Sequence, residues 1–295
     1  MRIDAHHHLW TLARGDYGWL TPALAPIHRD FSLADLAPHL AVADIQGTIL
    51  VQAAPTEAET MFLLDIAKAQ VVRGVVGWTD FDAADGGARI DVLAAHKLLV
   101  GLRPMVQDVP DDDWLLRPAL APLLAAMARN SLVFDALALP RHLPRLLRLV
   151  DNHPDVQFVL DHCAKPRLAT GEIADWHGDV ALLAERPNIV CKLSGLATEA
   201  AVGWQITDLR KAVDHVVACF GTHRLMWGSD WPVSIWRAVM KNGLPPPKPC
   251  WPICQRTKRQ LFSAVTRRGS ISQAGDGMSR PIDRPATFLP PWSNR

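Results

Sequence analysis

Short apolar runs alternate with segments of helical periodicity along most of the chain. Eight runs have the length and branched residues of buried strands: Arg2–His8, Gly47–Gln52, Val71–Trp78, Leu98–Val106, Ser131–Asp135, Val156–His162, Asn188–Ser194 and His223–Asp230. Seven segments between them repeat apolar residues at helical spacing: Leu33–Ala43, Glu57–Gln70, Ala88–His96, Pro118–Arg129, Leu143–Asp151, Glu172–Glu185 and Ile206–Phe220. The runs are apolar throughout, which is typical of a parallel sheet covered on both faces.

Strict alternation with eight strands predicts an α/β protein with a closed (β/α)₈ barrel, the TIM-barrel fold. The alternative is an open, doubly wound sheet. That fold usually has a glycine-rich turn after its first strand, and this chain has Ala5-His6-His7-His8 there.

Length and composition favour one large domain in the cell interior. The chain has 295 residues, of which 49% are hydrophobic, and it contains no uncharged apolar run of about 18 residues, the length of a membrane span. Its first residues, Met1-Arg2-Ile3-Asp4, do not resemble a secretion signal. The five cysteines are scattered and odd in number. We therefore expect a reduced, cytoplasmic protein with no membrane partner; the oligomeric state does not follow from the sequence.

Polar residues gather where the predicted strands end, and in a barrel those carboxyl ends line the active site. The residues concerned are His6, His8, Arg103, Gln107, Asp135, Asp161, His162, Lys192, Ser194 and Asp230. Packing alone does not explain polar side chains directly after apolar runs. This pattern predicts an enzyme that acts on a small molecule.

Two histidines of the first predicted strand form a candidate metal site. His6 and His8 share one face because strand side chains alternate with a period of two, and two imidazoles on one face suit a metal such as Zn²⁺. A buried structural histidine is the alternative for each. Asp230 follows the eighth strand in Gly228-Ser229-Asp230, where it is a candidate ligand and general base, or alternatively a turn residue.

Four further residues are candidates for contact with substrate. His162, at the end of the sixth strand, could donate to a carbonyl oxygen or ligate a metal. Lys192, Arg103 and Gln107 are candidates for orienting substrate hydroxyls or a carboxylate. A surface salt bridge is an equally good explanation for Arg103.

Several segments together resemble the amidohydrolase superfamily, within it the branch of L-fuconolactone hydrolases and 2-pyrone-4,6-dicarboxylate lactonase. The segments that carry the resemblance are Ile3–His8, Asp16–Leu20, Gly74–Trp78, Val159–Pro166, Cys191–Leu196 and Phe220–Pro232. The resemblance covers roughly residues 2–233 and implies a (β/α)₈ barrel. It also implies that Asp230 is the general base and that His6, His8 and His162 ligate a metal or polarise a carbonyl.

The resemblance limits the number of metal ions. Other superfamily members use a bridging Lys or Glu on the fourth strand for a second metal, and Leu98–Val106 offers neither. We therefore expect at most one divalent metal, Zn²⁺ or another, and this branch includes members that work without one.

The resemblance stops after Val233, and the remaining 62 residues differ in composition. Residues 234–295 hold eleven Lys and Arg against two Asp, a net charge of +9, whereas residues 1–233 carry −8. They also hold nine of the 23 prolines and no apolar stripe. We expect a barrel over 1–233 and an irregular tail over 234–295, so that a helix after the eighth strand is missing or irregular.

The genetic code explains the tail as a frameshift. If the third base of each codon is read with the first two of the next, residues 261–271 can encode Ile-Phe-Gly-Gly-Asn-Ala-Ala-Arg-Phe-Tyr without a mismatch. Family members end in this way. We infer a frameshift near 233–235, so the basic charge does not indicate a nucleic-acid partner.

The sequence therefore predicts a hydrolase that opens a sugar-acid or dicarboxylate lactone. Three alternatives stay open: a decarboxylase or an amide hydrolase on the same barrel, an inactive frameshifted remnant, and a basic RNA-binding protein. The last is weakened because the positive charge lies only in the tail, without interleaved aromatic residues.

Overall fold

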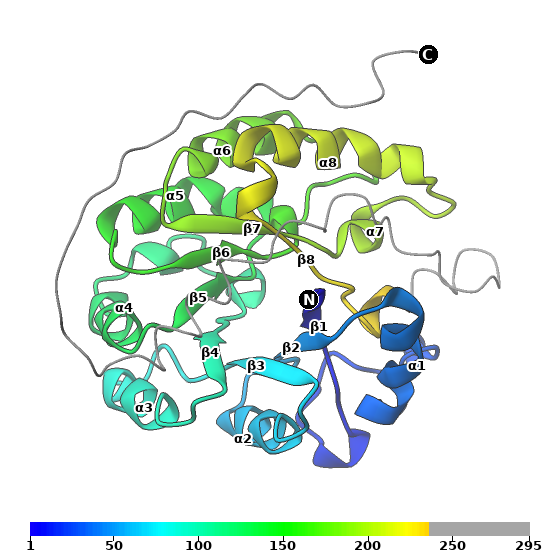
Figure 1. Cartoon of the computed structure of the whole chain (residues 1–295). Helices are drawn as coiled ribbons and strands as arrows, with labels where there is room; N and C mark the ends of the chain where they lie inside the picture. Colours follow the sequence, from blue (N-terminus) through cyan, green and yellow to red (C-terminus); the bar gives the residue numbers. More distant parts are fainter. Residues whose placement is uncertain (236–295) are drawn as a thin grey trace, which may run out of the picture.

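A computed structural model describes residues 1–235 of the chain. Eight parallel strands form one sheet in the order of the sequence. They are β1 (Ile3–His7), β2 (Gly47–Val51), β3 (Val72–Gly77), β4 (Leu99–Leu102), β5 (Val133–Ala136), β6 (Phe158–Leu160), β7 (Ile189–Leu193) and β8 (Leu225–Trp227). The sheet curls into a barrel with the helices outside (Figure 1). The predicted fold class is confirmed.

Helices cover the outside of this barrel. They are α1 (Leu33–Ala43), α2 (Glu57–Ile66), α3 (Gly86–Leu93), α4 (Leu120–Arg129), α5 (Leu143–Asn152), α6 (Ala174–Ala184), α7 (Leu196–Glu199) and α8 (Ile206–Phe220). All seven predicted helices are present. The sequence missed α7, whose four residues are too few to display a helical period. Among the described residues, no helix has the length and apolar character needed to cross a membrane.

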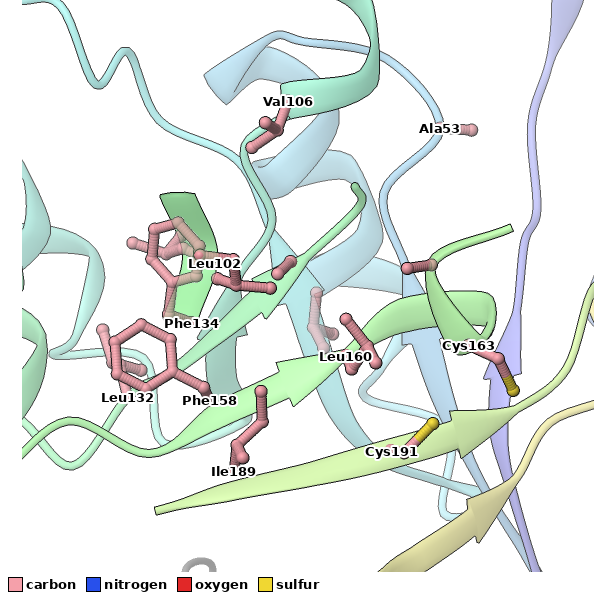
Figure 2. Close-up of a cluster of buried hydrophobic side chains, with 14 of the residues drawn as sticks. Ala53, Leu102, Val106, Leu132, Phe134, Phe158, Leu160, Cys163, Ile189 and Cys191 are labelled. Atoms are coloured by element: carbon pink, nitrogen blue, oxygen red, sulfur yellow. The ribbon is translucent and has the colours of Figure 1, made fainter. Parts of the chain in front are cut away.

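The strands bury side chains on both faces, as the unbroken apolar runs predict. Outward-facing residues such as Leu102, Phe134 and Leu160 pack with helix residues in the main hydrophobic core (Figure 2). A smaller set that includes Ala5, Val159 and Met226 packs inside the barrel. Because both faces are covered, the polar residues that the strands carry are confined to the strand ends.

The barrel closes between β1 and the residues that follow β8. The amide of Asp230 donates to the carbonyl of His6 (2.8 Å), and the amide of His8 donates to the carbonyl of Trp231 (2.7 Å). We call this junction the barrel seam. Gly228 permits it, because a Cβ atom there would lie 2.4 Å from Cβ of His6. The seam places Asp230 beside His6 of β1 and His8, which directly follows β1.

The structure describes only the first residues of the predicted irregular tail. Residues 233–235 are helical, and the amide of Ser234 donates to the carbonyl of Asp230 (2.8 Å). Residues 236–295 lie outside the described part of the chain. The predicted domain boundary and the predicted lack of a regular final helix are therefore not tested.

Candidate active site

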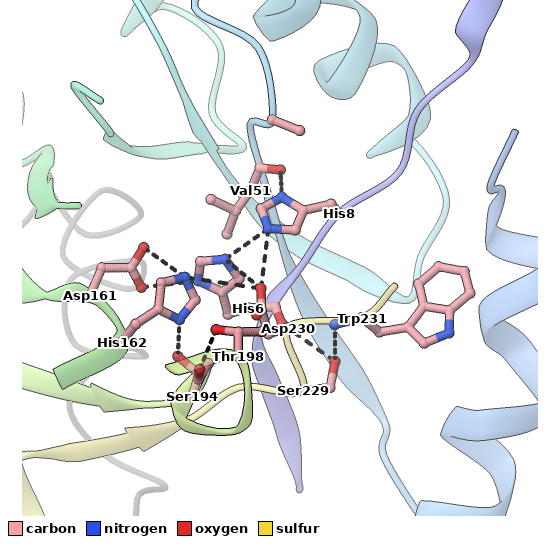
Figure 3. Close-up of polar contacts among 12 residues, drawn as sticks. His6, His8, Val51, Asp161, His162, Ser194, Thr198, Ser229, Asp230 and Trp231 are labelled. Carbon is pink, nitrogen blue, oxygen red and sulfur yellow. Dashed lines mark hydrogen bonds and ion pairs between the residues drawn. The ribbon is translucent and has the colours of Figure 1, made fainter. Parts of the chain in front are cut away.

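The predicted site residues converge at the carboxyl ends of the strands. Side chains of His6, His8, His162 and Asp230 point toward one another (Figure 3). Nε2 of His6 lies 3.0 Å from Nε2 of His8, and Asp230 Oδ1 lies 3.7 Å and 3.5 Å from these atoms. His162 Nε2 is 4.0 Å from the same oxygen. All four residues are buried.

The hydrogen bond of His8 fixes its tautomer. Its Nδ1 lies 2.9 Å from the carbonyl oxygen of Val51, and because a carbonyl only accepts, Nδ1 carries the proton. In the neutral form of His8, Nε2 therefore points an electron pair at His6 and Asp230. This is the orientation that a metal-binding histidine takes when a neighbouring acceptor holds its other nitrogen.

His6 has partners for either tautomer. Its Nδ1 lies 3.1 Å from Asp161 Oδ1, which would accept a proton, and 3.3 Å from Nζ of Lys192, which would donate one. With the proton on Nδ1, His6 presents a second electron pair on Nε2. With the proton on Nε2, His6 donates a hydrogen bond to Nε2 of His8 instead, and both nitrogens then have a partner without a cation.

The donor set fits one cation. Two imidazole nitrogens and one carboxylate oxygen, from His6, His8 and Asp230, are 3.0–3.7 Å apart. Ligands about 2.0–2.1 Å from a tetrahedral ion are about 3.4 Å from one another. Burial and the charge of Lys192 lower the pKa of His6 well below its usual value, although Asp161 opposes them. The His6 ring is therefore neutral near neutral pH and does not balance the negative charge of Asp230.

The pKa of Asp230 lies below its usual value of 3.8. Burial raises it, but the neighbouring His162 and His8 lower it by more. The carboxylate is therefore ionised near neutral pH. The ion-pair contact with each of the three imidazoles involves Oδ1, so Oδ2 is the candidate oxygen to accept a proton.

Asp161 contacts four of the candidate site residues, although the sequence assigned no role to it. One oxygen lies near His6 and Lys192 (3.1 and 3.5 Å), and the other near Arg103 and His162 (3.0 and 3.5 Å). The contacts with the cations and imidazoles lower the pKa of Asp161 well below its usual value, although burial raises it. The signal that could have identified it is an Asp-His pair directly after a buried strand.

Lys192 and Arg103 lie beside the site, and each has a carboxylate partner. Nζ of Lys192 donates to Asp135, and a guanidinium nitrogen of Arg103 donates to Asp161 (3.0 Å). Nε of Arg103 has no hydrogen-bond partner among residues 1–235. Both cations are buried, so their predicted contact with substrate stays a prediction.

Gln107 lies farther out, in a 3₁₀ turn (Val106–Asp108) after β4. Its Oε1 accepts a hydrogen bond from Nζ of Lys165 (2.6 Å), a residue that follows His162. Both side chains are half-buried. This pair was not predicted, although each residue belongs to a polar segment that follows a strand.

A cavity of 410 Å³ lies at the other end of the barrel. Apolar strand residues form most of its wall, and its rim includes residues that precede strands, such as Ser131, Gln157 and Arg224. Asp135 and Lys192 reach its inner end. The cluster of imidazoles and carboxylates is at the opposite end, where a barrel normally binds its substrate.

The chain is similar to lactonases and to a zinc-bound amidohydrolase. An L-fucono-1,5-lactonase from Burkholderia ambifaria is 46% identical over 234 residues, with 79% of this chain and 81% of the relative covered. One from Burkholderia multivorans is 35% identical over 247 residues, with 80% and 83% covered. A crystal structure of a Burkholderia multivorans amidohydrolase with bound zinc has a TM-score of 0.75 and 34% identity, and covers 81% of this chain and 89% of that one. The amidohydrolase family profile matches residues 3–238. The chain belongs to the amidohydrolase family.

Proposed function

We propose that this enzyme hydrolyses a small lactone, the internal ester of a sugar acid or a dicarboxylic acid. The observation that carries the proposal is the ionised, buried Asp230 carboxylate beside three imidazoles at the active-site end of the barrel. A carboxylate in this position can take a proton from water. The lactonase relatives support the substrate class.

We propose that His6, His8 and Asp230 hold a single divalent metal ion, with Zn²⁺ the first candidate because of the zinc-bound relative. When bound, the ion supplies positive charge that polarises the lactone carbonyl. The hydrogen bond from His8 to Val51 and the proximity of His6 to Asp161 orient the two rings for this role.

The protein's own groups account for the proton movements. Oδ2 of Asp230 takes a proton from water while the water oxygen bonds to the carbonyl carbon. His162 donates a hydrogen bond to the carbonyl oxygen, where negative charge develops. The ring C–O bond then breaks, and Asp230 returns its proton to the departing oxygen. Water and lactone thus become one hydroxy acid.

The polar groups around this centre are the candidates for orienting the substrate. Gln107 and Lys165 are half-buried and can meet hydroxyl or carboxylate groups of the substrate. Arg103 is buried and already paired with Asp161, so it has less freedom for the same purpose. Lys192, whose charge is already paired with Asp135, is the candidate with the least freedom to bind substrate.

A panel of sugar and dicarboxylate lactones tests the proposal, with a pH indicator to follow acid release. The wild-type chain should open at least one lactone faster than the buffer does. Asp230→Asn removes the base and keeps the shape, so its kcat should fall by about 10²–10⁴-fold. Near-normal turnover by this variant would remove Asp230 from the mechanism.

A further inference from the structure

Ser194 and Gly195 hold one edge of the His162 ring. Ser194 Oγ lies 2.9 Å from Nδ1 of His162. The next residue, Gly195, approaches so closely that a Cβ atom would lie 2.5 Å from the same nitrogen. The hydroxyl and the bare backbone together fix the orientation of the ring.

The backbone at His162 is itself in an unusual conformation. His162, Cys163, Ala164 and Lys165 all have φ between 49° and 57°, the left-handed region that residues other than glycine seldom adopt. Such strain persists only where the surroundings impose it, and it gathers at functional sites. The turn brings the ring of His162 against Ser194 and directs Nε2 toward the reaction centre.

The charges around Nε2 favour one tautomer. Nε2 of His162 faces Asp161 Oδ2 at 3.5 Å and Asp230 Oδ1 at 4.0 Å. A proton on Nε2 is attracted to both carboxylates, whereas an electron pair there is repelled by them. Nδ1 then carries the electron pair, and a serine hydroxyl can donate to it.

We propose that Ser194 is a positioning residue that donates to Nδ1 of His162 and so keeps the His162 proton on Nε2. His162 then has the opposite tautomer to His8, whose proton is on Nδ1. His8 presents an electron pair to a cation, and His162 presents a proton to the carbonyl oxygen. The catalytic consequence rests on the proposed function, but the tautomer is a property of the free protein.

Nitrogen NMR of metal-free protein with ¹⁵N-labelled histidine tests the tautomer, with a His162→Gln variant to assign the signals. In the wild type and in Ser194→Thr, which keeps the hydroxyl, His162 should be protonated on Nε2 alone. Ser194→Ala should give a mixture of tautomers. Ser131→Ala, which removes a hydroxyl at the other end of the barrel, should match the wild type.

The same variants can be compared in turnover. Loss of a group that orients a catalytic histidine costs about 10–100-fold, so kcat of Ser194→Ala should fall by this factor with KM little changed. Ser194→Thr should retain most of kcat. If no lactone is turned over, the proposed function fails and the NMR result still decides the tautomer.

Four results would overturn the proposal. The first is a wild-type protein in which Nδ1 of His162 carries a proton, whether or not Nε2 does. The second is an unchanged His162 tautomer in Ser194→Ala. The third is a normal kcat in Ser194→Ala, and the fourth is an equal loss of kcat in Ser194→Thr.

Discussion

A methyl group at Gly228 should loosen the barrel seam. In Gly228→Ala, the new Cβ would lie 2.4 Å from Cβ of His6 and 3.1 Å from its backbone nitrogen. These atoms belong to β1, so no flexible side chain can move aside. Overpacking of this kind costs about 1–3 kcal/mol, and at roughly 2–4 °C per kcal/mol the Tm should fall by about 2–12 °C.

Gly178→Ala is the matched control. Gly178 lies on the exposed face of α6, and a Cβ atom there would meet no atom of the described residues within 4 Å. Alanine in a helix is favoured over glycine by about 0.5–1 kcal/mol, so this variant should melt slightly higher than the wild type. Calorimetry of the three proteins decides the matter. A Tm of Gly228→Ala equal to that of the wild type would refute the close approach at the seam.

Three other predictions concern pH, metal and the tail. Burial raises the pKa of Glu59 to about 7, although the backbone amides of Ala53 and Ala54 lower it. Between pH 4.5 and 7 the folded state therefore keeps a proton on Glu59 that the unfolded state has lost. The free energy of unfolding should fall by about 3 kcal/mol over this range. Denaturant titrations of Glu59→Gln should lack that part of the fall, and an identical pH profile would contradict it. Calorimetric titration with Zn²⁺ should show one site, weakened at least about tenfold in His8→Ala; equal affinity would remove His8 from the ligand set. Restoring the shifted frame near 233–235 should raise the Tm, and a coding sequence without the inferred third bases would refute the frameshift.

The sequence was informative wherever a period or an abrupt change of polarity exists. The boundaries of α1 and α8 agree with prediction at both ends, because each helix has an apolar stripe and a defined start. The predicted strand Leu98–Val106 was too long: β4 ends at Leu102, and Pro104, which lacks an amide hydrogen, belongs to the irregular segment that follows.

Polarity at strand ends predicted which side chains converge but could not predict their hydrogen-bond and ion-pair partners. His6, His8, His162 and Asp230 were grouped correctly because every carboxyl end of a parallel barrel faces the same side. The partners of each ring depend on distances of 3–4 Å between strands that are far apart in sequence. Examples are the acceptor of His8 and the Asp161 carboxylate that contacts both His6 and Lys192. A single chain carries no signal for these.

Isotope labelling tests whether water adds to the carbonyl carbon of a lactone in this site. The best substrate of the lactone panel is hydrolysed by the wild-type chain in ¹⁸O-labelled water, and the product is analysed by mass spectrometry. We expect one ¹⁸O atom per turnover, located in the new carboxylate, with the new hydroxyl unlabelled. Label in the hydroxyl, or a chain that opens no lactone in the panel, would contradict it.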